Sequence, residues 1–338
     1  MKSLQFTAPG DPASVLHLTE LPLPQPGPGQ VRVRMLASPV NPSDLMYVRG
    51  HYTVPPVCPA VPGFEGVGIV EASGGGWRGK LFTGRRVVVL NRAGGNWSEY
   101  AIVPDQQIVP VSSSLSDEQA ACFFVNPATA WVMTREVLRV PPGAWLLQTA
   151  AGSALGRMII RLGKLCGFRT LNIVRREAQV NELRQLGADA VLVCSGEGDS
   201  DPTDLADRIR SITGNSGLLY AVDAVGGPTG SAVVRSLGPG GRMLAYGTLS
   251  GQPLSFSPRT LMTVGSSVEG FWLGNFMLKR GLLFRLGLVR RLTRLIRSGI
   301  LSTEIAGTWP LEHAAAAVRA AEDSAVSGKC LLKIQSDR

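Results

Sequence analysis

Small residues follow a short apolar run near the middle of the chain and could bind a phosphate group. The run Ala144–Thr149 has the length of a strand, and residues 150–156 form a turn before apolar residues that recur at helical spacing. Such a turn presents backbone N–H groups at a helix N-terminus, where a pyrophosphate can bind. The Gly-x-Gly-x-x-Gly pattern is degraded, because Ala151 and Ser153 replace its first two glycines and only Gly156 remains. Small side chains still let phosphate approach the backbone, and the alternative is an ordinary strand-to-helix turn.

Two arginines, Arg175 and Arg176, follow the next predicted strand, Thr170–Val174. A unit that binds NAD places Asp or Glu there, about 20 residues beyond the glycines, to hold the ribose 2′-hydroxyl. A carboxylate would repel a 2′-phosphate, whereas a guanidinium forms a charge-assisted fork with it. Solvated arginines at a strand end are the alternative. The position favours NADPH over NADH as the cofactor.

The length and composition are those of a loop-rich globular enzyme. The 338 residues suffice for two domains, and 44% of them are hydrophobic and 17% charged. The apolar stretch Leu278–Ile296 is interrupted by six cations, so no membrane span is expected. The N-terminus resembles neither a signal peptide nor a transit peptide, which predicts a cytoplasmic protein. The five scattered cysteines include no Cys-x-x-Cys pair and signal neither a disulfide framework nor a zinc site.

The formal net charge of +9 is concentrated between Lys279 and Arg297. Arg290, Arg294 and Arg297 fall on one face of a predicted helix. This face is either a solvated surface or a surface that attracts anions, such as coenzyme A phosphates or an acidic carrier protein. Nucleic acid is not an expected partner, because no stacking aromatics or DNA-reading motif accompany the charge.

The first 110 residues alternate with period two and are rich in proline and glycine, which predicts a β-rich, irregular domain. The expected strands are Val31–Met35, Glu65–Ala72, Arg85–Leu90 and Trp97–Val103. A long loop, Ser38–Pro62, contains a short predicted helix, Ser43–Arg49, with Ser43 as its N-cap. Loops of this length on a rigid scaffold often carry function.

From Ser116, where a capping box can open a helix, the chain alternates between helical and strand patterns. Such alternation predicts a doubly wound parallel sheet. Beyond the elements named above, we expect helices at Asn126–Leu138, Ala178–Leu186, Asp204–Ile212, Thr229–Leu237 and Leu311–Glu322, and strands at Ala190–Val193, Leu218–Val225, Arg242–Tyr246, Ser267–Phe271 and Lys329–Ile334. The last strand is expected to return to the first domain.

This organisation resembles the medium-chain dehydrogenase/reductase superfamily. The resemblance implies an α/β fold with a GroES-like β-rich catalytic domain (residues 1–122 and 301–338) and an NADPH-binding Rossmann domain (residues 123–300). Many members are zinc alcohol dehydrogenases, and here the chain departs from them. Asn41 stands where those enzymes carry a zinc-binding cysteine, and Phe64 stands where they carry a histidine. Because neither side chain is a zinc ligand, we expect no metal.

Among the zinc-independent members, the chain is most similar to the mitochondrial-type trans-2-enoyl thioester reductases. The similarity is carried by residues 41–44 (Asn-Pro-Ser-Asp), 49–52 (Arg-Gly-His-Tyr), 95–97 (Gly-Asn-Trp), 125–130 (Val-Asn-Pro-Ala-Thr-Ala), 170–175 and 270–273 (Gly-Phe-Trp-Leu). In that family the tyrosine of the Gly-x-Tyr loop is the catalytic acid or enolate stabiliser, and Tyr52 matches it. A phenol, with an ordinary pKa near 10, can donate a hydrogen bond or a proton at neutral pH. Read without the resemblance, Tyr52 would be a loop-packing residue.

The resemblance also implies a set of residues around the cofactor. The nicotinamide end would be held by Asn126 and Thr129, the pyrophosphate by Gly152, Ser153, Ala154 and Leu155, the 2′-phosphate by Arg175 and Arg176, and the remainder by Tyr246, Gly247, Phe271, Trp272 and Lys329. A capping or packing role is the alternative for Asn126 and Thr129, core packing for Phe271 and Trp272, and a solvated side chain for Lys329. The substrate would be an enoyl-CoA or enoyl-carrier-protein, the alternative reaction would be reduction of a free enone or quinone, and the chain would pair as a homodimer through the sheet-edge strand Ser267–Phe271.

Overall fold

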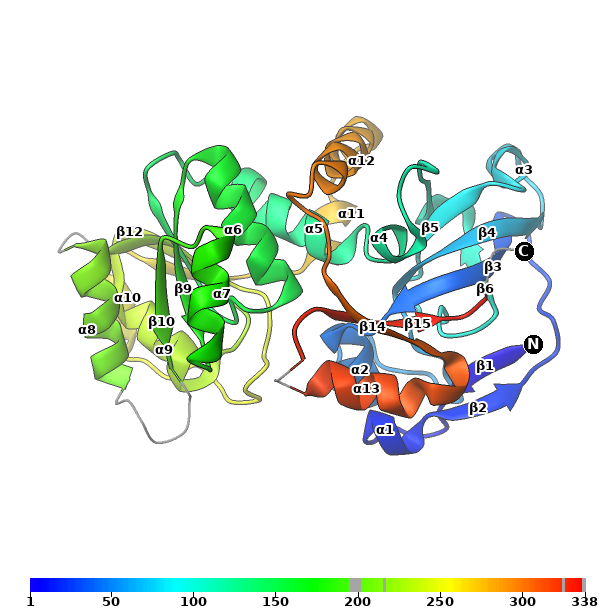
Figure 1. The fold of residues 1–338 in the computed structure, drawn as a ribbon, viewed down its shortest axis with the longest axis horizontal. Coiled ribbons are helices and arrows are strands. Elements are labelled where there is room, and N and C mark those ends of the chain that lie inside the picture. Colours follow the sequence, from blue (N-terminus) through cyan, green and yellow to red (C-terminus); the bar gives the residue numbers. More distant parts are fainter. Residues whose placement is uncertain (195–201, 215–216, 324–325, 336–338) are drawn as a thin grey trace. The chain divides into compact units, whose positions relative to one another are not determined.

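The computed structural model describes residues 1–194, 202–214, 217–323 and 326–335 (Figure 1). The chain divides into two compact units. The first comprises Met1–Val125, Leu292–Arg297 and Ser302–Arg338, and the second comprises Asn126–Arg291 and Ser298–Leu301. Within the described ranges, no helix is long and apolar enough to cross a membrane.

The first unit is built around a sheet whose described strands follow the order β14-β15-β3-β4-β5-β7, with β6 pairing with β3 as well. These strands are β3 (Gln30–Pro39), β4 (Glu65–Ser73), β5 (Arg86–Leu90), β6 (Tyr100–Pro104), β7 (Ile108–Pro110), β14 (Ile305–Pro310) and β15 (Lys329–Lys333). Alternate residues of β3, among them Val31, Val33 and Met35, are fully buried, as the period-two pattern predicts. The C-terminal strand β15 pairs antiparallel with β3, so the chain end does return to this unit.

Short elements surround this sheet. A separate pair of antiparallel strands, β1 (Lys2–Gln5) and β2 (His17–Glu20), accompanies it. The helices are α1 (Pro12–Val15), α2 (Pro42–Val48), α3 (Trp77–Phe82), α4 (Asp117–Ala121) and α13 (Ala314–Glu322), with single 3₁₀ turns η1 (Asp105–Gln107) and η3 (Leu311–His313). The side chain of Ser116 accepts a hydrogen bond from the Gln119 N–H, so the predicted cap at the start of α4 is confirmed.

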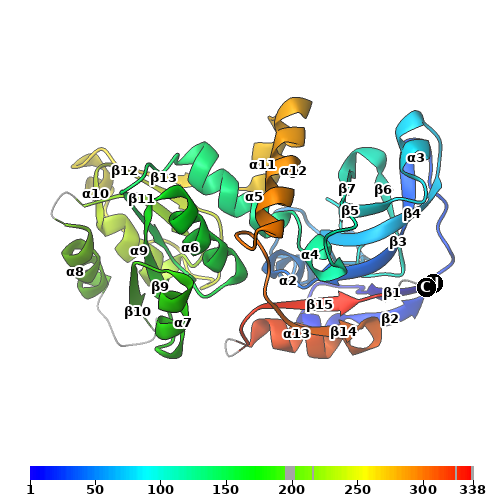
Figure 2. The same cartoon turned by 45° about the horizontal axis from the view of Figure 1, so that its top comes forward.

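The second unit contains a parallel sheet whose described strands follow the order β10-β9-β8-β11-β12-β13 (Figure 2). The strands are β8 (Trp145–Gln148), β9 (Arg169–Val174), β10 (Ala190–Val193), β11 (Leu218–Asp223), β12 (Leu237–Ala245) and β13 (Ser267–Gly270). The strand order reverses between β8 and β11, and such a switch point is where open parallel sheets bind ligands. β13 lies at one edge, as the sequence predicted.

Helices α6 (Ala154–Cys166), α7 (Ala178–Leu186), α8 (Pro202–Thr213) and α9 (Gly227–Arg235) pack on this sheet. The remaining helices of this part of the chain are α5 (Val125–Trp131), α10 (Pro258–Met262), α11 (Leu273–Leu278) and α12 (Leu282–Arg297), and the last turns of α12, Leu292–Arg297, are grouped with the first unit. α6 and α7 share one apolar cluster containing Ile160 and Leu183. α8 and α9 share another, which contains Ile209 and Val233. Two separate helix layers therefore cover the sheet, which is the doubly wound α/β arrangement expected from the sequence.

The helix predicted at Asn126–Leu138 differs in its second half. α5 ends at Trp131, and the chain continues as a π-helical turn, η2 (Val132–Val137). The Thr134 hydroxyl donates to the Ala130 carbonyl at 2.7 Å, and the Leu138 N–H bonds to the Met133 carbonyl five residues back. A β-branched hydroxyl that bonds to the preceding turn loosens the α-helical ladder, which sequence periodicity does not reveal.

Candidate active site

A tight turn links β8 to α6 at the switch point of the second unit. Ala150 has a positive φ of 50°, and Ser153 caps α6 by accepting a hydrogen bond from the Gly156 N–H at 3.1 Å. A side chain at position 156 would place its Cβ 2.4 Å from the Ala151 carbonyl oxygen, so this position requires glycine. Gly152 and Ala154 are half-buried, Ser153 is exposed and Leu155 is buried. The turn predicted to bind the pyrophosphate is therefore formed, and it leads into a helix N-terminus that Ser153 caps and that suits an anion.

A hydrogen-bond network below the turn holds the neighbouring strand ends in place. The Gln148 side-chain amide donates to the Gly156 carbonyl at 2.9 Å. The Thr149 hydroxyl donates to the buried Asp223 carboxylate at 2.6 Å. The same carboxylate accepts the Gly226 N–H at 2.9 Å. The hydrogen bond between Thr149 and Asp223 thus joins the carboxyl ends of β8 and β11.

Two further predicted residues follow β12 at the same edge of the sheet. The N–H of Tyr246 donates to the Asp223 carbonyl at 2.8 Å, and Tyr246 and Gly247 are half-buried. Burial, and secondarily the charge of Asp223, raise the pKa of the Tyr246 phenol above its ordinary value. Tyr246 is therefore neutral near pH 7 and can only act as a hydrogen-bonding group there.

Two aromatic residues predicted at the cofactor, Phe271 and Trp272, follow β13. Phe271 donates its N–H to the Ala245 carbonyl at 2.8 Å and is half-buried. Trp272 precedes α11 and is 36% exposed. Residues after β8, β12 and β13 therefore share the carboxyl edge of one parallel sheet, as expected for a cofactor site.

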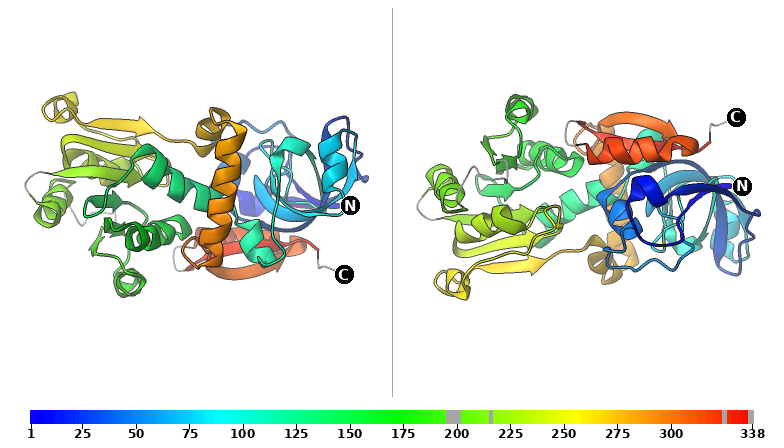
Figure 3. Two further views of the ribbon diagram at one scale, coloured as in Figure 1. Left: turned by 90° about the horizontal axis from the view of Figure 1, so that it is seen from above. Right: turned by 90° about the horizontal axis from the view of Figure 1, so that it is seen from below.

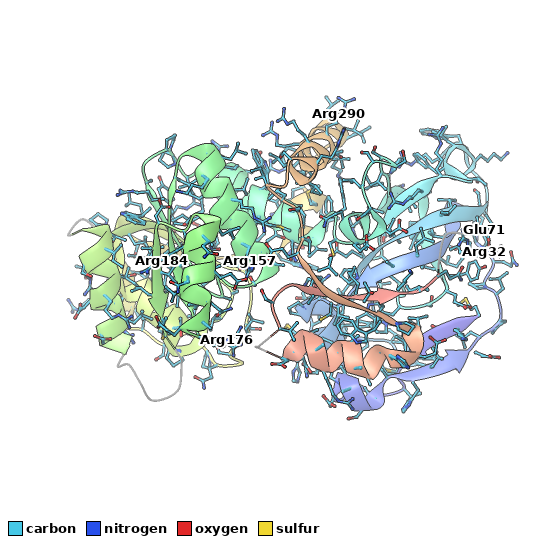
Figure 4. The ribbon with its side chains drawn as sticks, viewed as in Figure 1. Arg32, Glu71, Arg157, Arg176, Arg184 and Arg290 are labelled. Carbon is cyan, nitrogen blue, oxygen red and sulfur yellow. The ribbon has the colours of Figure 1, made fainter. Side chains whose placement is uncertain are left out.

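The two arginines expected at the 2′-phosphate follow β9, whose partner strand is β8. Arg175 is exposed and Arg176 is half-buried; Arg176 is labelled in Figure 4. Asn126 and Thr129 lie on α5, where Asn126 is half-buried and Thr129 buried. The residues of this unit thus fit NADPH: a capped helix N-terminus for the pyrophosphate, and guanidinium groups rather than a carboxylate after β9.

Arg157 is a residue that sequence reasoning missed. Although it is a charged side chain, it is only 3% exposed. Its Nε donates to the Gly152 carbonyl at 3.1 Å, and its Nη2 lies 2.6 Å from Glu182 of α7 (Figure 4). Gln179 of α7 also lies against Gly152. Arg157 therefore connects the predicted pyrophosphate turn to the helix that follows the two predicted 2′-phosphate arginines.

Replacing Arg157 by methionine should remove this connection while keeping the length of the side chain. We expect the free energy of unfolding to fall by about 2 kcal/mol, because a buried charge-assisted hydrogen bond is lost. We also expect the NADPH dissociation constant to rise roughly tenfold, equivalent to about 1.4 kcal/mol. Urea unfolding and NADPH fluorescence titration measure the two effects. Arg184→Met on the exposed face of α7 is the matched control and should change neither. Unaltered NADPH affinity in the Arg157 variant would refute the positioning role.

The catalytic tyrosine predicted in the first unit lies in the loop after α2. Tyr52 is half-buried, and its ring lies 5.0 Å from that of Phe64. Phe64 in turn packs on Tyr47 at 5.2 Å. Gly50 starts the loop with a φ of 73°, a conformation that suits glycine. Aromatic packing on a rigid helix therefore restricts where the Tyr52 hydroxyl can be.

The start of α2 corrects one sequence expectation. The N-cap is Asn41 and not Ser43, and Pro42 is the first helical residue. The Asp44 carboxylate accepts the Asn41 N–H at 2.8 Å and the Phe64 N–H at 3.0 Å. Proline suits the first helical position, and the Asp44 carboxylate satisfies the N–H of the N-cap residue Asn41. The helix therefore begins earlier than the sequence predicted. Burial raises the pKa of Asp44 to about 7.

A buried polar cluster surrounds Asn41, the residue expected at the position of a zinc-binding cysteine, and includes Glu65 and Lys329. The Asn41 side-chain amide donates to Glu65 at 2.9 Å, and its oxygen accepts from the Lys329 Nζ at 2.8 Å. The second Glu65 oxygen accepts the Val125 N–H at 2.9 Å. Burial raises the pKa of Glu65, against the opposing effect of these hydrogen bonds and of Lys329. Asn41 is therefore fully engaged with a cation and a carboxylate.

The residues present do not fit a zinc ion at this cluster. Amide oxygen and ammonium groups are not the thiolate and imidazole ligands that zinc prefers. In the described ranges, no group of three or more His, Cys, Asp or Glu side chains could hold a metal. Lys329, predicted at the cofactor, is 8% exposed and donates to Asn41, so this contact accounts for its burial; the cofactor role stays a prediction.

Comparison with known proteins places this architecture in a family. The family description "Alcohol dehydrogenase GroES-like domain" matches residues 27–113, and "Zinc-binding dehydrogenase" matches residues 154–285. The chain is 31% identical over 336 residues to the mitochondrial enoyl-[acyl-carrier-protein] reductase of Bos taurus, covering 98% of this chain and 88% of the relative.

Solved structures share the fold over nearly the full length. A Bacillus thuringiensis protein assigned as an NADPH:quinone reductase superposes with a TM-score of 0.89 at 31% identity, covering 99% of both chains. Escherichia coli quinone oxidoreductase complexed with NADPH superposes with a TM-score of 0.88 at 25% identity, covering 98% of this chain and 100% of the other. The chain therefore belongs to the medium-chain dehydrogenase/reductase superfamily.

Proposed function

We propose that this chain, an NADPH-dependent oxidoreductase of its superfamily, reduces the C=C bond of α,β-unsaturated (2-enoyl) thioesters. The similarity in sequence to enoyl-[acyl-carrier-protein] reductases over 98% of the chain carries the proposal. The formed turn at α6, the guanidinium groups after β9 and the NADPH-bound Escherichia coli relative support the choice of cofactor. A reaction without a metal is part of this proposal, and the hydrogen bonds of Asn41 to Lys329 and Glu65 support it.

NADPH, when bound, supplies a hydride to the β-carbon of the thioester. The electron pair of the C=C bond then moves toward the thioester oxygen, and the resulting enolate needs stabilisation and a proton at the α-carbon. We assign both tasks to the Tyr52 hydroxyl, which is protonated at neutral pH at its ordinary pKa near 10. Water replaces the donated proton. The net change is one hydride and one proton added across the double bond.

The assignments of Asn126, Thr129, Gly152, Ser153, Ala154, Leu155, Arg175, Arg176, Tyr246, Gly247, Phe271, Trp272 and Lys329 to the cofactor belong to this proposal. So do a catalytic domain of residues 1–122 and 301–338, a cofactor domain of residues 123–300, and a homodimer. A cytoplasmic location is likewise a prediction only, since the bovine relative is described as mitochondrial.

A second candidate reaction is reduction of quinones or free enones, because the solved structures named above are described as quinone reductases. NADPH oxidation with crotonyl-CoA and with a simple benzoquinone distinguishes the two. We expect the kcat/KM for crotonyl-CoA to exceed that for the quinone by at least about 100-fold, a difference of roughly 2.7 kcal/mol in transition-state binding. Faster turnover of the quinone would overturn the proposed substrate class.

A further inference from the structure

A buried carboxylate in the first unit, that of Asp44, takes no part in the proposed chemistry. Asp44 lies on α2, drawn in blue in Figure 3, and is fully buried. Its two oxygens accept the backbone N–H groups of Asn41 at 2.8 Å and of Phe64 at 3.0 Å. The second of these bonds joins α2 to the residue that directly precedes β4, 20 residues further along the chain.

The Asp44 carboxylate is the hydrogen-bond partner of the main chain at Phe64. Among the described residues, no main-chain carbonyl accepts the Phe64 N–H, so without the carboxylate this group would lose its acceptor. Phe64 stands between Gly63, whose φ of 100° suits glycine, and Glu65, the first residue of β4. The carboxylate therefore holds the main chain in place at the entrance to β4.

The ring of Phe64 lies between two tyrosine rings. It is 5.2 Å from the ring of Tyr47, edge-on at 76°, and 5.0 Å from the ring of Tyr52, tilted by 37°. Tyr47 is buried on α2, whereas Tyr52 belongs to the loop after that helix. Aromatic rings at these separations prefer defined relative orientations. A displacement of the Phe64 main chain would therefore move the Tyr52 ring and its hydroxyl.

We propose that Asp44, in its ionised form, is a positioning residue for the Tyr52 hydroxyl and acts through the N–H and the ring of Phe64. An ionised carboxylate accepts both N–H groups, in charge-assisted bonds that are roughly twice as strong as neutral ones. A protonated carboxyl keeps one good acceptor, and its O–H is a donor that would face an N–H. Protonation would thus loosen the Phe64 main chain. The inference rests on the proposed function, because it concerns the group assigned there to the enolate.

The surroundings of Asp44 set the pH at which its charge changes. Burial is the largest effect and, together with the charge of Glu65 on β4, raises the pKa of Asp44 to about 7. The N–H groups of Asn41 and Phe64 and the ammonium group of Lys329 on β15 lower the pKa and oppose this rise. Burial also raises the pKa of Glu65. Asp44 therefore changes its charge close to neutral pH.

The ionised form of Asp44 lowers the stability of the fold. Its pKa of about 7 in the folded chain lies above the ordinary value of 3.8, so between these pH values the folded chain holds a proton that the unfolded chain has lost. The stabilising contribution of this group is full below about pH 4 and is lost as the pH rises to about 7. A buried group that opposes folding at neutral pH is typical of functional sites.

The pH dependence of turnover is the first test. With saturating NADPH and crotonyl-CoA, we expect kcat to fall at least about tenfold between roughly pH 8 and pH 5.5, with a midpoint near 7, because a displaced hydroxyl is poorly aligned. Asp44→Asn imitates the protonated carboxyl, so its kcat should stay at the low value over the whole range, with the NADPH dissociation constant unchanged. A fall with the same midpoint in Asp44→Asn would overturn the proposal.

Two further measurements separate positioning from other causes. A histidine can change its charge between about pH 5 and 8, so His51→Gln, next to Tyr52, is the control and should keep the fall in kcat; loss of the fall in this variant would assign it to His51. In thermal unfolding, the melting temperature of the unaltered protein should decrease relative to that of Asp44→Asn as the pH rises toward 7. A difference that does not change with pH would contradict the buried charge.

An NMR titration of the unaltered protein needs neither a variant nor turnover. With ¹⁵N-phenylalanine, the Phe64 amide proton should shift with a midpoint near pH 7, since it is bonded to the carboxylate. With ¹³C-tyrosine, the ring signals of Tyr52 should follow that midpoint, whereas those of Tyr100 on β6, outside the aromatic cluster, should not. Tyr52 signals that do not follow it would overturn the inference. Turnover of a quinone but not of crotonyl-CoA would overturn the proposed function alone and leave both titrations in place.

Discussion

Replacing Tyr52 by phenylalanine should lower the turnover number for enoyl thioester reduction by roughly 10²–10⁴-fold, the usual effect of losing a general acid. The variant keeps the ring that packs 5.0 Å from Phe64, so the loop after α2 keeps its shape. It loses only the hydroxyl that would stabilise the enolate and protonate the α-carbon. The dissociation constant of NADPH should not change. Stopped-flow measurement of NADPH oxidation together with fluorescence titration separates the two quantities.

The chain offers a matched control in Tyr47, on α2 in the same aromatic cluster. Its hydroxyl donates to the Ala93 carbonyl at 3.3 Å, and burial raises its pKa. Tyr47→Phe should cost about 1 kcal/mol of stability for the lost hydrogen bond, with turnover preserved within a few-fold. Equal losses of turnover in the two variants would show that the loop needs its hydroxyls for packing, and the catalytic assignment of Tyr52 would fail.

The second large effect concerns the choice of cofactor. Replacing both Arg175 and Arg176 by alanine should lower kcat/KM for NADPH by roughly 100-fold, since hydrogen bonds to charged groups contribute about 1.5–3 kcal/mol. The value for NADH should stay the same, because NADH has no 2′-phosphate. The ratio of the two kcat/KM values, measured at one ionic strength, is the quantity to follow.

Arg184→Ala is the control for the loss of a nearby positive charge, because Arg184 is exposed on α7, the helix that follows the two arginines. It should leave the cofactor ratio unaltered. If the double variant lost activity with NADPH and NADH to the same extent, the arginines would be structural, and the 2′-phosphate would have to be bound elsewhere.

Local sequence signals predicted the cofactor turn with good accuracy. Strand β8 and the turn before α6 lie at the predicted residues 144–149 and 150–156, whereas the cap by the Ser153 side chain was not part of that prediction. Apolar periodicity and a left-handed glycine are sufficient to define such a unit. The position of β13 at the sheet edge also follows from strand order alone. The roles of Tyr52 and of the cofactor residues rest on resemblance, and the experiments above are what tests them.

Contacts between distant residues could not be predicted in this way. Lys329 bonds to Asn41 across 288 residues, and no local pattern indicates that a C-terminal lysine is buried beside a polar cluster. From the sequence, Arg157 was expected to be an ordinary exposed polar residue of α6. Its burial could not be predicted, because it depends on its contact with Glu182 of α7, a later element of the chain. β14 was not predicted, because its sequence Ile-Ala-Gly-Thr-Trp-Pro contains Gly and Pro, which are disfavoured in strands, and its pairing with β15 and the packing of Trp309 involve residues distant in the chain.

The most direct measurement uses NADPH that carries deuterium at the transferable position of nicotinamide C4. Crotonyl-CoA is reduced in ordinary water, and the butyryl product is analysed by NMR. We predict one deuterium at C3 of the acyl chain and a solvent-derived hydrogen at C2, with the thioester intact. Deuterium at C1 or C2, or no reduction of the thioester under conditions in which a quinone is consumed, would contradict the account.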